Sequence, residues 1–62
     1  MTYSVGDMVE RIMEYSDKTE TIRGTIIKVD AIHMWVYWFH SGVQGKFFHR
    51  TMKDIITVVA NG

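Results

Sequence analysis

The chain has 62 residues with neither cysteine nor proline, and its seven basic and seven acidic side chains balance to a formal net charge of zero. This length indicates one domain over residues 1–62, with a core from about Val5 to Val59, and the lack of cysteine excludes disulfides and thiolate metal ligands. The hydrophobic fraction of 47% argues against disorder. Since neither a signal peptide nor a membrane-spanning run is visible, we expect a cytoplasmic protein.

The first half of the chain predicts two strands joined by a polar loop. A Gly6-Asp7 turn leads into a strand from Met8 to Glu14, although its apolar positions would also suit one face of a short helix. Residues Tyr15 to Glu20 are polar and predict a loop. A run rich in β-branched residues predicts a strand from Thr21 to Val29, in which Gly24 is typical of a bulge or a sharp bend.

The second half predicts three more strands and a single helical turn. An aromatic segment alternates like a strand, a glycine-containing turn follows it, and a short polar stretch has room for one turn of helix but no more. In chain order the elements are a turn at Asp30-Ala31, strand Ile32 to His40, turn Ser41 to Gly45, strand Lys46 to Arg50, helical turn Thr51 to Asp54 and strand Ile55 to Val59.

Five short strands with a helical turn before the last predict an all-β fold, a small and strongly bent antiparallel barrel. Five landmarks are spread along the chain: Val5-Gly6-Asp7-x-Val9, Gly24 to Asp30, Val36-Tyr37-Trp38, Gly45 and Asp54-Ile55. With these landmarks the chain resembles SH3-like barrels, especially KOW-type and Tudor-like modules, and the resemblance implies this five-stranded barrel without implying a function. Small proteins of this outline are also common among bacteriophage products, and a phage-encoded protein would act in the host cytoplasm.

The aromatic strand has more apolar side chains than a chain of this size can cover. Alternation puts one row of three side chains in the core and the other row outside, where exposed aromatics indicate contact with a partner. Cover by N-terminal residues, including Tyr3, or by rings across the hairpin would hide the outer row instead. The inner row is Met34, Val36 and Trp38, and the outer row is Trp35, Tyr37 and Phe39.

The register of the following hairpin decides which residues join the outer row. A two- or four-residue connection centred between Gly42 and Val43 pairs Trp38 with Phe47 and Trp35 with Arg50. Lys46, Phe48 and Arg50 then face outward, and Arg50 stacks on Trp35. A three-residue connection shifts the pairing by one, so that Phe48 turns inward while Phe47 and His49 turn outward. We favour the first register because it keeps Lys46 and Arg50 in water.

Nothing in the chain predicts an enzyme, a cofactor or a metal site. Cysteine nucleophiles, serine-hydrolase elbows and phosphate-binding loops are missing from the sequence. His33 and His40 are an odd number of residues apart and face opposite ways in a regular strand, whereas His40 and His49 approach each other across the hairpin. Without an adjacent carboxylate or thiolate, we interpret all three histidines as solvated or hydrogen-bonding groups.

The function expected is a non-catalytic protein-interaction or assembly module, bound to a protein or to a second copy as in a homodimer. Residues 1–20 hold five acids against two bases and residues 21–62 five bases against two acids, so the surface is either mixed or dipolar. Nucleic-acid binding is the alternative, which net neutrality makes weaker. The binding residues are Trp35, Tyr37, Phe39, Lys46, Phe48 and Arg50, joined in the alternative by Arg23, Lys28 and Lys53.

Overall fold

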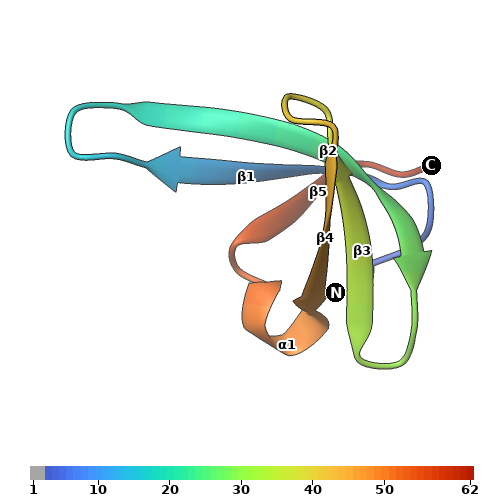
Figure 1. Cartoon of the computed structure of the whole chain (residues 1–62). Helices are drawn as coiled ribbons and strands as arrows, with labels where there is room; N and C mark the ends of the chain where they lie inside the picture. The colour runs from blue at the N-terminus through green and yellow to red at the C-terminus, as the bar shows by residue number, and fades with distance from the viewer. Residues whose placement is uncertain (1–2) are drawn as a thin grey trace.

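The structure, a computed structural model, describes residues 3–62, which form five antiparallel strands in one sheet and a single helical turn (Figure 1). This confirms the expected all-β class with one helical turn before the last strand, although the helix begins two residues earlier than predicted. The elements are β1 (Met8–Glu14), β2 (Thr19–Val29), β3 (His33–Trp38), β4 (Val43–Phe48), α1 (His49–Met52) and β5 (Ile56–Ala60).

The strand order in the sheet is β4-β3-β2-β1-β5, so each strand pairs with its neighbour in the chain except β5, which returns to pair with β1. Over residues 3–62 the sheet is open, with β4 and β5 at its edges, and the closure expected of a barrel is not formed. The long strand β2 serves both halves of the sheet, because residues 19–25 pair with β1 and residues 24–29 with β3. Figure 1 shows β1 and the first half of β2 extending from the body as an arm.

The core lies on the inner face of this bent sheet. Met34 and Val36 are fully buried and Trp38 is 7% exposed, which confirms the predicted inner row of the aromatic strand. Tyr3, also buried, closes one end of the core, because its hydroxyl donates to the Ile56 carbonyl oxygen at 2.7 Å. The buried cluster comprises Tyr3, Val9, Ile26, Met34, Val36, Trp38 and Ile56.

Gly24 does not form the bulge that its position in β2 predicts. The register against β3 shifts between Ile26 and Lys28, so the extra residue is Ile27. Gly24 is needed for another reason: a Cβ atom there would lie 2.9 Å from side-chain atoms of Val36 and Trp38 and would overlap the Tyr37 carbonyl oxygen. The glycine therefore allows β3 to pack directly against β2.

The β3–β4 hairpin has neither of the two registers considered from the sequence. Trp38 pairs with Val43 and Trp35 with Lys46, so the predicted pairs Trp38–Phe47 and Trp35–Arg50 are wrong. The four-residue turn lies earlier because Gly42 has φ 69° and its amide donates to the Trp38 carbonyl oxygen at 2.9 Å. The shift is an even number of residues, so each side chain of β4 keeps the side of the sheet that the favoured register assigned to it.

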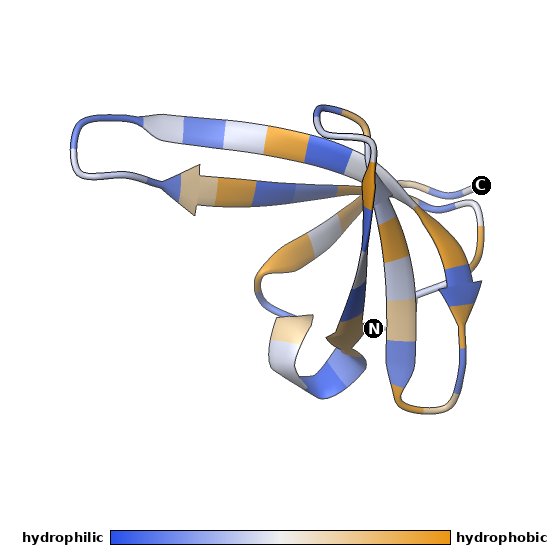
Figure 2. Cartoon of the chain, viewed as in Figure 1, coloured by the Kyte–Doolittle hydropathy of each residue, from blue (hydrophilic) through white to orange (hydrophobic). Residues whose placement is uncertain are grey.

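The arm carries both polar and apolar residues, visible as blue and orange bands in Figure 2. Ile12 and Tyr15, near the end of the arm, are 59% and 48% exposed. Along residues 3–62, no helix has the length and hydropathy needed to cross a membrane.

Candidate functional site

The outer face of β3 presents Trp35 between two lysines. Lys28 of β2 and Lys46 of β4 are its cross-strand partners, and their Nζ atoms lie 4.6 and 5.3 Å from the centre of the Trp35 ring. Trp35 is half-buried, because the lysine side chains cover part of the indole. Each contact has the geometry of a cation–π interaction, worth about 0.5–1 kcal/mol at an exposed site.

Two further rings extend this face toward the β2–β3 turn. The centres of the His33 and Phe48 rings lie 4.6 Å apart, and His33 is 6.0 Å from the ring of Trp35. Phe48 is 55% exposed and Ile32, in the turn, is 58% exposed. We call the set Lys28, Ile32, His33, Trp35, Lys46 and Phe48 the aromatic–basic face.

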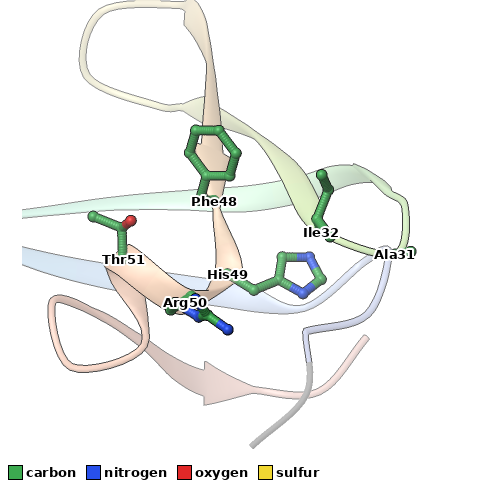
Figure 3. A pocket seen from close by; sticks show the side chains of 6 residues that line it. All are labelled: Ala31, Ile32, Phe48, His49, Arg50 and Thr51. Atoms are coloured by element: carbon green, nitrogen blue, oxygen red, sulfur yellow. The ribbon is translucent and has the colours of Figure 1, made fainter.

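A pocket of 470 Å³ borders this face beside α1, lined by Ala31, Ile32, Phe48, His49, Arg50 and Thr51 (Figure 3). Arg50 lies in α1 and not on β4, so the predicted stacking of Arg50 on Trp35 is wrong. Arg50 instead lines the pocket, as Phe48 does (Figure 3). The His49 ring is held by a 2.8 Å hydrogen bond between its Nε2 atom and the His33 carbonyl oxygen.

Tyr37 and Phe39 form a separate aromatic pair at the other end of β3. Phe39 lies in the β3–β4 turn, 49% exposed, and its ring is 6.1 Å from that of Tyr37 in an edge-on arrangement. The Phe39 amide donates to the Arg23 carbonyl oxygen at 3.0 Å, which ties the turn to the arm. The predicted outer row is therefore divided, with Trp35 in the aromatic–basic face and Phe39 beside the arm.

Asp30 organises the turn from which Ile32 and His33 project. Its Oδ1 atom accepts hydrogen bonds from the amides of Ile32 and His33, at 2.9 and 2.6 Å. These two hydrogen bonds lower the pKa of the Asp30 carboxyl group, and the neighbouring His33 adds a smaller effect in the same direction. The His33 Nδ1 atom lies 3.4 Å from the same carboxylate oxygen. These hydrogen bonds therefore fix the backbone from which the Ile32 and His33 side chains project.

Ile32 and His33 belong to this face although the sequence did not predict them as binding residues. Lys28 was expected to bind nucleic acid, but its place beside Trp35 was not predicted. The available signal was the pair of consecutive isoleucines before Lys28, because two adjacent aliphatic residues interrupt strict alternation. That interruption coincides with the bulge at Ile27.

Within residues 3–62, no group of three or more His, Cys, Asp or Glu side chains is placed to hold a metal ion. Comparisons with protein-family models, with curated proteins and with solved structures find no match for the chain. The geometry of the aromatic–basic face is therefore the feature of the molecule that bears on its function.

Proposed function

We propose that this chain is a non-catalytic protein-interaction or assembly module that binds through the aromatic–basic face. The observation that carries the proposal is the position of Trp35, an indole held on the outer face of three paired strands. Rigid strands pre-organise the ring and so reduce the entropy lost on binding. Trp is also among the residues that contribute most at protein interfaces.

The surroundings of Trp35 support a protein partner. The His33 ring lies between Trp35 and the exposed Phe48, and Ile32 is exposed in the adjoining turn. Lys28 and Lys46 supply charge beside the indole. An apolar centre with a charged rim is the usual composition of a protein interface. Tyr37 and Phe39 are a second aromatic contact on the same strand and the turn after it.

The test compares Trp35→Ala with Trp38→Ala. Trp35→Ala should keep the wild-type circular dichroism spectrum and lose self-association in light scattering, or lose a partner that the wild-type chain captures. Trp38→Ala is the matched control, since loss of a buried Trp costs about 3–5 kcal/mol and should unfold a domain this small. A folded Trp35→Ala variant that associates and captures partners like the wild type would contradict the proposal.

Nucleic-acid binding is the second candidate, favoured by one observation: both cations nearest Trp35 lie over an aromatic ring on which a base would stack. It predicts that single-stranded RNA or DNA quenches Trp fluorescence at low salt and that added salt reverses the effect. Unchanged fluorescence at saturating oligonucleotide and low salt counts against this candidate.

We also propose that the open sheet is a variant of the SH3-like barrel and that the module acts in the cytoplasm, which for a phage-encoded protein is that of the host. Support for the barrel comes from the strand order, in which β5 returns to β1, and from the helical turn before β5. A structure determined by NMR in solution tests this, because pairing between β4 and β5 would close the sheet.

A further inference from the structure

An acidic groove lies at the opposite end of the sheet from the aromatic–basic face. It has a volume of 330 Å³ and is lined by residues of β1, of the turn before β5 and of β5 itself. Two exposed isoleucines supply apolar surface to its lining, Ile12 at 59% and Ile55 at 43% exposure. The full lining is Glu10, Ile12, Glu14, Asp54, Ile55 and Thr57.

The charge of this groove is opposite to that of the aromatic–basic face. Glu10 is paired with Arg23 at 2.9 Å, whereas Glu14 and Asp54 have no ion-pair partner within residues 3–62. Strands β3 and β4 hold no acidic residue, and Lys28 and Lys46 are the cations over Trp35, while the Asp30 carboxylate lies beside His33 at the turn. Complementary charges of this kind select partners and fix their register.

We propose that the partner of the aromatic–basic face is a second copy of this chain, whose acidic groove receives it. The inference rests on the proposed function and names the partner for it. Glu14 and Asp54 of one copy pair with Lys28 and Lys46 of the next, while Trp35 and Phe48 cover Ile12 and Ile55. Each copy has both surfaces, so the contact brings together two different patches of the same chain.

The charge distribution favours a second copy over a nucleic acid. A phosphate backbone following the sheet would gain from Lys28 and Lys46 and then meet Glu14 and Asp54. The chain as a whole has a net charge of zero, so two copies approach each other without overall repulsion. The apolar residues of the groove also match a partner with rings, whereas phosphate groups gain nothing from them.

The test is a charge exchange between Glu14→Lys and Lys46→Glu, followed by analytical ultracentrifugation of each variant alone and of their mixture. Each variant alone juxtaposes like charges and should associate at least about tenfold more weakly than the wild type. The mixture should regain association, because the intact face of the first variant meets the intact groove of the second. Asp17→Lys is the matched control: it makes the same charge change at the tip of the arm, outside the groove, and should associate like the wild type.

Three outcomes would overturn this inference. None of them decides the proposed function, which the comparison of Trp35→Ala with Trp38→Ala tests separately. One is a wild-type chain that stays monomeric up to about millimolar concentration, the affinity of a weak complex. Another is that Trp35→Ala loses association whereas Glu14→Lys does not. This result would support binding through the aromatic–basic face and would contradict the acidic groove as its partner surface. The third is a mixture that associates no better than its components. A monomer that binds single-stranded DNA through Lys46 would point to the nucleic-acid candidate instead.

Discussion

Lys28 and Trp35 are cross-strand partners, with the Lys28 Nζ atom 4.6 Å from the centre of the Trp35 ring. The pair exists because Ile27 is an extra residue in β2, between Ile26, which pairs with Val36, and Lys28. In an uninterrupted register Ile27 would oppose Trp35 and Lys28 would oppose Met34, a fully buried residue. One bulge therefore places a cation on the outer face of the sheet and keeps it out of the core.

The first prediction concerns the energy of this pair. Lys28→Ala should lower the free energy of unfolding by about 0.5–1 kcal/mol through loss of the cation–π contact. A double-mutant cycle with Trp35→Ala, measured by urea unfolding, isolates the coupling. The parallel cycle with Lys46→Ala should give a smaller coupling energy, because the Lys46 Nζ atom lies farther from the ring centre, at 5.3 Å. Equal effects of Lys28→Ala in the wild-type and Trp35→Ala backgrounds would show that the two side chains are not coupled.

The inner row of β3 could be predicted from the sequence because it depends on local alternation alone. Met34, Val36 and Trp38 occupy every second position, and a strand with one covered face must bury one such row. The number of strands and their succession along the chain followed in the same way from short β-rich runs separated by glycine and polar turns.

Trp35, Lys46 and Phe48 lie on the outer face as alternation predicts. The place of Lys28 beside Trp35 and the positions of Phe39 and Arg50 could not be predicted, since they depend on two register choices. Both Gly42 and Gly45 are suited to a hairpin turn, and the structure uses Gly42 with its positive φ of 69°. That choice leaves Phe39 in the turn and begins α1 directly after Phe48, so Arg50 lies on the helix. The bulge at Ile27 is the second choice, and its position depends on the twist of the complete sheet.

The second prediction concerns Gly24, where β2 and β3 approach closely. Gly24→Ala introduces a Cβ atom against the Tyr37 backbone and should cost about 1–3 kcal/mol, the usual penalty for overpacking. Gly42→Asn is the control, because its Cβ meets no atom closer than the Tyr37 hydroxyl at 3.6 Å and Asn tolerates a positive φ. In thermal unfolding, the midpoint temperature of Gly24→Ala should be well below that of Gly42→Asn. The reverse ranking would contradict the close packing of β2 on β3.

The third prediction concerns Tyr3, which anchors the start of the described chain to β5. Tyr3→Phe removes the hydrogen bond to the Ile56 carbonyl oxygen and should lower the free energy of unfolding by about 0.5–1.5 kcal/mol at neutral pH. Urea unfolding of the two proteins at pH 7 measures this difference. A variant as stable as the wild type would mean that the Ile56 carbonyl oxygen gains an equivalent partner, such as water.

The same residue gives a fourth prediction, for alkaline pH. Burial raises the pKa of Tyr3 above its ordinary value of 10.0, and the nearby Asp54 charge raises it further. Because the folded state favours the protonated phenol, this stabilisation is complete below pH 10 and is lost as the pH rises through the folded-state pKa. Wild-type stability should therefore fall relative to Tyr3→Phe above pH 10, and Asp54→Asn should make this fall smaller, because it lowers the folded-state pKa toward the unfolded value. Parallel profiles for wild type and Tyr3→Phe would contradict this.

The last prediction concerns Asp30 at acid pH. Hydrogen bonds from the Ile32 and His33 amides lower the pKa of the Asp30 carboxyl group, so the folded state favours the carboxylate. The resulting stabilisation is present above the unfolded-state pKa, near 3.8, and is lost as the pH falls through the lower folded-state value. Asp30→Asn keeps an acceptor oxygen but no titrating group, so its stability should converge with that of the wild type as the pH falls below 3.8. Asp30→Ala lacks the acceptor and should be the least stable of the three at pH 7, by urea unfolding. A constant difference between wild type and Asp30→Asn from pH 7 to pH 2 would show that this carboxylate does not stabilise the turn through its charge.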